Sequence, residues 1–177
     1  MAMKQTIEAQ ELLDSATVTG EQVAAVLRRR RLEVDVEMVQ GADGGTSFVR
    51  ATMPGTAGRQ SGGPAPTLGI IGRLGGIGAR PAAIGLVSDG DGAVTAVACA
   101  LKLGDMAATG DRLPGDVIVA THICPDAPVI PHDPVPFMGG PVGTATMNRY
   151  EVDPAMEAIL GGGVEAGDVV VIRYEGP

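Results

Sequence analysis

Three uninterrupted apolar runs in the middle of the chain constrain its fold more than any other feature. They are TLGIIG at 67–72, IGLVS at 84–88 and GDVIVATHI at 115–123. A strand with one wet face alternates apolar and polar residues, so unbroken runs are typical of strands that are covered on both faces. Helices on both faces of a partly parallel sheet are the arrangement of α/β proteins. We therefore predict an α/β domain.

Helical patterns flank these runs. DGAVTAVACALKLGDM, at 91–106, places Val94, Val97 and Leu101 near one face and predicts a helix between the second and third strands. Two shorter helices are expected near the start, over Lys4 to Ser15 and after Thr19, which forms a capping-box pattern with the glutamine three residues later.

A period-two pattern follows the two leading helices. LEVDVEMV, from residue 32, alternates apolar and acidic residues, and GADGG separates it from TSFVRATM. The segment 32–53 is therefore predicted to be a β-hairpin at one side of a mixed sheet. Towards the end we expect a short helix over Pro154 to Leu160 and a strand at DVVVIRY, 168–174. Residues 1–160 are predicted to form a single α/β domain, and residues 161–177 a short turn and a terminal strand.

The charge of the chain limits the classes of partner. The 177 residues carry a formal net charge of −8, which disfavours nucleic acid and anionic membranes because both require a basic footprint. The one basic run, RRRR at 28–31, ends a predicted helix, where cations complement the helix dipole; a phosphate or partner patch is the alternative.

The sequence also bears on where the protein works. No apolar stretch approaches the ~20 residues that span a bilayer, the first residues lack the apolar core of a secretory signal, and two cysteines form no disulfide framework. We expect a cytoplasmic protein, a homo-oligomer, whose ligand is a small molecule.

Polar residues lie at three points where predicted strands end at the carboxyl edge of the sheet. α/β proteins bind their ligands at this edge. The first such segment is GRLGGIGARP, at 72–81. Its backbone N–H groups and two arginines favour an anion, and the candidate residues are Arg73, Gly75, Gly76, Gly78 and Arg80. Because Pro81 replaces the third glycine of a dinucleotide fingerprint, a dinucleotide site is disfavoured, and a tight structural loop is the alternative.

The second segment places Asp89 at a strand end and Asp91 just before a helix. Hard carboxylate oxygens at such a position are suitable ligands for a divalent cation. A helix cap, in which one of the two carboxylates accepts the first N–H groups of the helix, is the alternative.

The third segment holds both histidines. His122 and Cys124 are two apart along a strand end, so their side chains share a side, with Asp126 further on, and His132 stands among prolines. Imidazole, thiolate and carboxylate all bind Zn²⁺. The metal candidates are therefore Asp89, Asp91, His122, Cys124 and His132, for Zn or Mn; a proline-stiffened surface loop with solvated histidines is the alternative.

Several long motifs of the sequence resemble those of a known family. ELLDSATVTGEQV, SGGPAPTLGIIGRLGGIGARPAAIGLVSDGDGAVTAVACALKLGDM, LPGDVIVATHICPDAPVIPHDPVPFMGGPV and TATMNRYEVDPAMEAIL resemble the amino-terminal half of the prokaryotic domain-of-unknown-function family 1177, over about residues 3–160. The resemblance implies a longer family pattern than this chain contains, and it implies no particular reaction.

GLVSDGDGAVTAVACALKL followed by GDVIVATHICPDAP is also similar in layout to co-catalytic zinc aminopeptidases. That similarity implies a related fold and matches Asp89 with the metal-bridging carboxylate of those enzymes. Their Glu-Glu pair is replaced by Cys124 and Pro125, so the usual two-metal site is not implied.

The last twelve residues, AGDVVVIRYEGP at 166–177, resemble a short segment of dihydroxy-acid dehydratases. So short a segment cannot carry that enzyme's iron–sulfur and magnesium chemistry. A truncated or fused reading frame is the hypothesis that explains both this tail and the missing half of the family pattern.

Three functions stay open at this point. The first is a hydrolase-like enzyme that acts on a small amide or peptide-like metabolite, with a metal at the strand ends. The second is a non-catalytic ligand-binding or assembly module, and the third is an inactive fragment. Whether the chain is an enzyme is not decided by its sequence.

Overall fold

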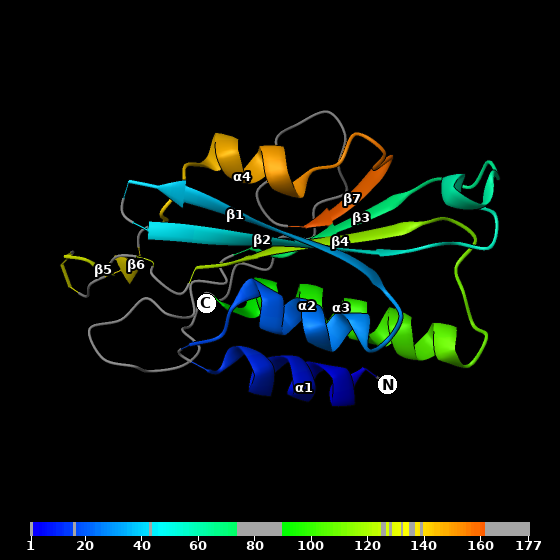
Figure 1. Cartoon of the computed structure of the whole chain (residues 1–177), viewed down its shortest axis with the longest axis horizontal. Coiled ribbons are helices and arrows are strands. Elements are labelled where there is room, and N and C mark those ends of the chain that lie inside the picture. Colours follow the sequence, from blue (N-terminus) through cyan, green and yellow to red (C-terminus); the bar gives the residue numbers. More distant parts are fainter. Residues whose placement is uncertain are drawn as a thin grey trace.

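The hairpin, two of the apolar runs and a short strand at residues 158–161 join into one five-stranded sheet in the computed structural model of the chain (Figure 1). The structure describes residues 2–15, 17–42, 44–73, 90–124, 127, 129–131, 133–134, 137–138 and 140–161. The strands are β1 (Glu33–Gly41), β2 (Gly44–Met53), β3 (Leu68–Ile71), β4 (Val117–Ile123), β5 (Val129–Ile130), β6 (Phe137–Met138) and β7 (Ala158–Gly161). The helices are α1 (Met3–Leu13), α2 (Gly20–Arg28), α3 (Asp91–Ala108) and α4 (Thr144–Glu151), with a 3-10 turn at Arg59–Ser61.

The sheet is mixed, as predicted. Its strand order is β1-β2-β4-β3-β7, with β5 and β6 paired separately. β2 is antiparallel to both β1 and β4, whereas β3 is parallel to both β4 and β7. The α/β fold with two leading helices and a hairpin is thus confirmed.

The two faces of the sheet are covered differently. Figure 1 shows α1, α2 and α3 on one side of the sheet and α4 on the other. Odd-numbered residues of β2 and β4, such as Val49 and Val119, pack with Val97 and Leu101 of α3 in the main hydrophobic core. Since side chains alternate along a strand, the even-numbered residues of β2 and β4 face α4. Phe48 illustrates this, because its ring stacks on that of Tyr150 in α4.

The two leading helices lie where the sequence predicts them, although α1 spans Met3–Leu13 rather than Lys4 to Ser15. Thr19 caps α2 through the predicted capping box: its hydroxyl accepts the Gln22 N–H, and the Gln22 side chain accepts the Thr19 N–H. Arg30 then joins three helices, since it donates to Glu8 of α1 and Asp105 of α3 just beyond the end of α2. These bonds hold the leading helices against α3.

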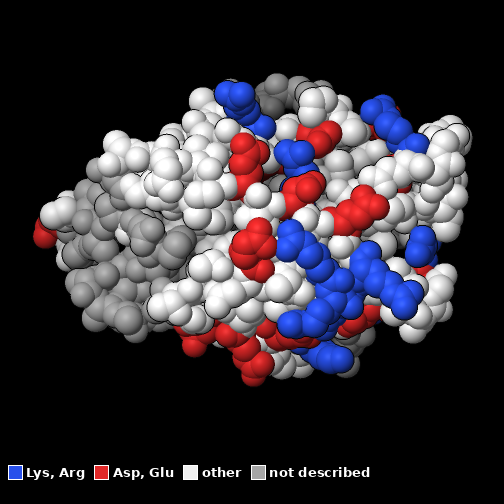
Figure 2. Space-filling model, in the orientation of Figure 1, with Lys and Arg blue, Asp and Glu red and all other residues white. Residues whose placement is uncertain are grey.

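The basic run is engaged within the fold. Arg28 forms an ion pair with Glu21, and its guanidinium also donates to the backbone carbonyl of Val34 on the edge strand β1. Figure 2 shows basic side chains gathered where α2 ends and β1 begins, with acidic side chains beside them. Two of the four arginines of the run, Arg28 and Arg30, are thus engaged in contacts within the fold, which favours the structural interpretation for these two residues.

One predicted element is wrong. The helix expected over Pro154 to Leu160 is instead a turn that leads into β7, and the helix lies earlier, at Thr144–Glu151. Asp153 sets the turn by accepting the Ala155 N–H at 2.8 Å, and residues 158–161 then pair with the open edge of β3. The strands predicted at 84–88 and 168–174 lie outside the described residues. Among the residues that the structure describes, no helix is both long and apolar enough to cross a membrane.

Candidate functional site

The carboxyl ends of β3 and β4 meet at one edge of the sheet because the two strands are parallel. Arg73 follows β3 by two residues, and His122 is the penultimate residue of β4. The first turn of α3 lies against the same edge: a Cβ added at Gly72 would be 1.9 Å from the carbonyl oxygen of Gly92, so a side chain at Gly72 would not fit. The ends of β3 and β4 and the start of α3 therefore lie near one another, as the sequence predicts.

His122 lies on the α4 side of the sheet and is only 2% exposed. Its register partner on β2 is Phe48, whose ring meets the imidazole edge to face at 5.9 Å between centroids. The stacked pair of Phe48 and Tyr150 closes this side of the ring. An imidazole in such apolar surroundings needs a polar partner.

That partner is Glu151, the last residue of α4, which is 0% exposed. Its Oε1 lies 2.5 Å from Nδ1 of His122, and its Oε2 lies 2.5 Å from Nε of Arg73. Arg73 also donates to the side-chain oxygen of Asn148, one turn earlier in α4. The result is a buried chain, Arg73–Glu151–His122, built from the ends of two parallel strands and one helix.

The contact with Glu151 determines which imidazole nitrogen of His122 can accept a proton. A carboxylate oxygen only accepts, so the Nδ1 of His122 carries a proton and donates it to Glu151. In the neutral ring the lone pair is then on Nε2. A carboxylate on the far nitrogen is how both general bases and metal-binding histidines are commonly held.

Cys124 lies near Glu151 but forms its hydrogen bond with another residue. Its Sγ is 3.3 Å from the hydroxyl of Thr46, and the side chain is 3% exposed. Burial raises the pKa of the Cys124 thiol to about 11; the Thr46 hydroxyl opposes this and the charge of Glu151 adds to it. The thiol is therefore protonated at neutral pH. Cys99 is half-buried in α3, where desolvation raises the pKa of its thiol as well.

Asp91 is the first residue of α3 and is exposed. The cap position belongs to Gly90, and Asp91 Oδ1 accepts the N–H of its neighbour Gly92 at 2.9 Å. Its carboxylate lies in the first turn, where it complements the helix dipole. The other predicted residues, Asp89, Asp126, His132, Gly75, Gly76, Gly78 and Arg80, lie outside the described residues.

The described part of the chain does not by itself make up a metal centre. No group of three or more His, Cys, Asp or Glu side chains within it could hold a metal ion. His122 and Glu151 are bonded to each other, and the Cys124 thiol is protonated and bonded to Thr46.

His122 is predicted from the sequence as a site residue, whereas Glu151, Asn148 and Tyr150 are not. These three residues belong to a mostly polar helix, in which only Glu151 is buried. The one signal that points to them is indirect, because a histidine at the end of a buried strand requires a hydrogen-bond partner from elsewhere in the chain.

Together, the mixed sheet and the buried Arg73–Glu151–His122 contacts at the carboxyl edge of its parallel strands define an α/β domain. Within that class the chain belongs to the family described as "Protein of unknown function (DUF1177)", whose pattern matches residues 37–173. The resemblance seen in the sequence is thereby confirmed.

Solved structures that share the fold include a bottromycin maturation enzyme and a glutaminyl cyclase. The Mn complex of the bottromycin maturation enzyme BotP matches 90% of this chain with a TM-score of 0.55 at 15% identity. A glutaminyl cyclase of an Acidobacteriales bacterium matches 90% with a TM-score of 0.50 at 11% identity. The chain spans 43% and 56% of those proteins, respectively.

Short matches to dihydroxy-acid dehydratases are also present. The chain is 45% identical to the enzymes of Solidesulfovibrio magneticus and Syntrophotalea carbinolica over 64 residues, which is 36% of this chain and 11% of each enzyme. It is 60% identical over 35 residues to dihydroxy-acid dehydratase 2 of Corynebacterium efficiens, 20% of this chain and 6% of that protein. The chain thus spans only a small part of these curated relatives.

Proposed function

We propose that this domain is a hydrolase-like enzyme for a small amide or peptide-like metabolite, with His122 as its base. The observation that carries the proposal is the 2.5 Å contact between His122 Nδ1 and the fully buried Glu151 carboxylate. A buried carboxylate that is itself held by Arg73 fixes both the tautomer and the orientation of the ring.

In the proposed reaction, Nε2 of His122 takes a proton from a water molecule whose oxygen attacks the amide carbonyl. The same proton then passes to the leaving nitrogen as the C–N bond breaks. Glu151 stabilises the imidazolium that forms between these steps, and Arg73 keeps Glu151 in place. Since His122 is 2% exposed, substrate reaches it only after a local opening of the fold.

A divalent metal is a separate part of the proposal. BotP, which shares the fold, was solved in complex with Mn, and this favours Mn or Zn here as well. A metal would polarise the carbonyl. The described residues do not supply enough ligands, so this part depends on Asp89 and His132 and no step above is routed through it.

Activity is tested with a panel of small amides and dipeptides, with products followed by mass spectrometry. The wild-type chain is expected to hydrolyse at least one substrate, and His122→Ala and Glu151→Gln to reduce kcat by roughly two orders of magnitude or more. Glu11→Gln, an exposed change on α1, is the control. Turnover that survives His122→Ala would contradict the proposal.

The metal is tested by elemental analysis of protein purified without an affinity tag. Stoichiometric Mn or Zn that is lost in Asp89→Ala would support the metal part. If no divalent metal is found and none raises the melting temperature, that part is wrong, while the role of His122 is judged by turnover alone.

A further inference from the structure

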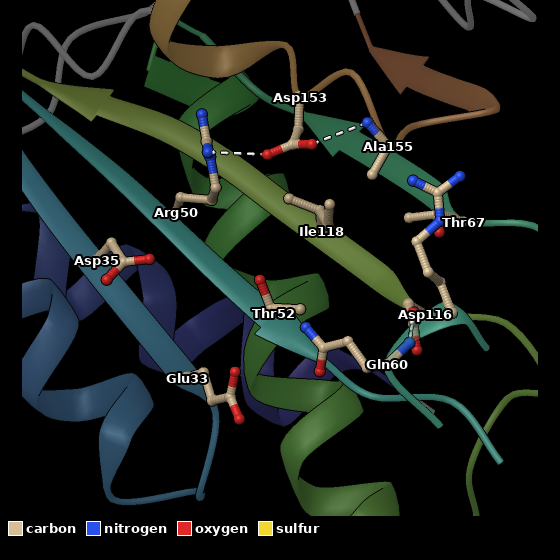
Figure 3. A pocket seen from close by; sticks show the side chains of 11 residues that line it. Glu33, Asp35, Arg50, Thr52, Gln60, Thr67, Asp116, Ile118, Asp153 and Ala155 are labelled. Carbon is tan, nitrogen blue, oxygen red and sulfur yellow. Dashed lines mark hydrogen bonds and ion pairs between the residues drawn. The ribbon is translucent and has the colours of Figure 1, made fainter. Parts of the chain in front are cut away.

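A cavity of about 310 Å³ opens on the α4 side of the sheet, near the amino end of β4. Figure 3 shows Ile118 and Thr52 at its base, Glu33 and Asp35 of β1 along one side, and Asp153 on another. We propose that this pocket binds a small zwitterion of dipeptide size, with the ammonium at Glu33 and Asp35 and the carboxylate at Arg59. Such binding is independent of the reaction suggested for His122.

The register of the sheet brings the acidic wall into the pocket. Glu33 is paired with Thr52 and Asp35 with Arg50, so these four side chains lie on the same face. Both acidic residues line the cavity, and they occupy successive same-face positions of β1, roughly 7 Å apart. One ammonium group placed between them can donate hydrogen bonds to both carboxylates.

Several of the pocket's charges are already engaged. Asp116 accepts the N–H groups of Gly55 and Gln60 with its two oxygens. Arg50 pairs with Asp153 at 3.0 Å and donates to the carbonyl oxygen of Tyr150 at 2.7 Å. These contacts engage both oxygens of Asp116 and both terminal nitrogens of Arg50, whereas the buried Nε of Arg50 has no partner among the described residues.

The remaining charges have no such partner. Glu33, Asp35 and Arg59 make no side-chain hydrogen bond or ion pair with any other residue that the structure describes. Two carboxylates on β1 and one guanidinium on the 3-10 turn therefore present opposite charges from two different elements that line one cavity. A molecule with an ammonium at one end and a carboxylate at the other complements both.

The size of the cavity points to a short ligand. A volume of about 310 Å³ is at the small end of ligand pockets and accommodates a dipeptide more readily than a longer peptide. The pocket is also distinct from the His122 site. Ile118 and His122 are four residues apart on β4, a distance of roughly 13 Å along a strand.

Binding is tested by calorimetry on the full chain with alanyl-alanine as the probe. We expect saturable binding by the free dipeptide. Binding should be at least tenfold weaker for N-acetyl-alanyl-alanine, which lacks the ammonium, and for alanyl-alaninamide, which lacks the carboxylate. The double variant Glu33→Gln, Asp35→Asn should lose at least tenfold in affinity. Arg59→Gln should bind the dipeptide and its amide equally well.

Matched controls separate specific contacts from overall charge. Glu37→Gln changes the next same-face acid of β1 outside the pocket, and Arg112→Gln changes an exposed arginine elsewhere; neither should alter affinity. His122→Ala should also leave binding unchanged, even if it abolishes turnover. No saturable binding up to about 10 mM dipeptide, or equal affinity in the double variant, would overturn the proposal. Loss of binding in a His122→Ala protein whose circular dichroism shows that it is still folded would overturn it as well.

Discussion

Glu151 is the residue on which the site depends. Its carboxylate is wholly buried, and each oxygen has one partner: Nδ1 of His122 and Nε of Arg73. Removing one member of such a buried ionic group leaves the others without compensation, which costs more than the group contributes as a whole. The same geometry that orients His122 therefore also ties α4 to the sheet.

This dependence predicts a graded effect of substitution at Glu151. Glu151→Ala should lower the free energy of unfolding by about 3–5 kcal/mol, since Arg73 and His122 lose their shared partner. Glu151→Gln keeps an acceptor and should cost less. Denaturant unfolding measures both, with Glu11→Ala on the exposed side of α1 as the control. Equal, small losses in both Glu151 variants would show that the buried chain contributes little.

The Cys124 thiol gives a second prediction for a single residue. Because burial raises its pKa to about 11, the reactive thiolate is scarce at pH 8. In a Cys99→Ala background, alkylation by iodoacetamide should be about a hundredfold slower than for free cysteine. Mass spectrometry of timed samples measures the rate. Alkylation as fast as that of the unfolded chain would contradict a buried thiol that is bonded to Thr46. Cys124 would then again be a candidate metal ligand in its deprotonated form.

At the scale of elements, the N-cap residue Thr19 stabilises the first turn of α2. Thr19→Ala removes the acceptor for the Gln22 N–H and should lower stability by about 1 kcal/mol, whereas Thr19→Ser keeps the hydroxyl and should cost much less. Thermal and denaturant unfolding report the difference. A similar loss in both variants would mean that the hydroxyl is not what holds the helix start.

The junction of α1, α2 and α3 should respond to acid. The hydrogen bond from Gln5 holds the pKa of Asp105 below its ordinary value of 3.8, burial opposes this, and Arg30 lowers it further. Asp105 therefore adds stability above that ordinary value, and this stability is lost as the pH falls through the lower folded-state pKa.

Asp105→Asn should accordingly cost about 1 kcal/mol at pH 7 and progressively less below about pH 4. Unfolding measured across this range tests the prediction. Asp111→Asn, an exposed change just past the end of α3, is the control. A difference between wild type and Asp105→Asn that stays constant down to about pH 2 would contradict the assignment.

At the scale of the whole molecule, local patterns predicted those elements whose partners are near in sequence or whose apolar runs are long. The capping box at Thr19, the hairpin of β1 and β2, and the fully buried β4 all follow from their own residues. The region after residue 143 was predicted less well. α4 is polar, and β7 is set by pairing with β3, about 90 residues earlier, which no local pattern reveals.

Some residues of the site also have a local sequence signal, and others have none. His122 is a metal-ligand candidate in the sequence because it ends a buried run, and Arg73 is an anion-binding candidate because it follows a predicted strand. Glu151 is not a candidate, because nothing around it marks a buried carboxylate; its burial arises only when α4 packs on the sheet next to Phe48. The dipeptide-sized pocket escaped prediction for a related reason, since its charges come from β1 and from the turn at Arg59.

The proposed function requires that Glu151 holds His122 with a proton on Nδ1 and a lone pair on Nε2. The chain has only two histidines, so ¹⁵N NMR of histidine-labelled protein resolves the ring directly, with His132→Asn to assign it. We predict that Nδ1 of His122 carries a proton and that its Nδ1 signal shifts in Glu151→Gln. A His122 protonated at Nε2, or a signal unchanged by that substitution, would contradict the claim.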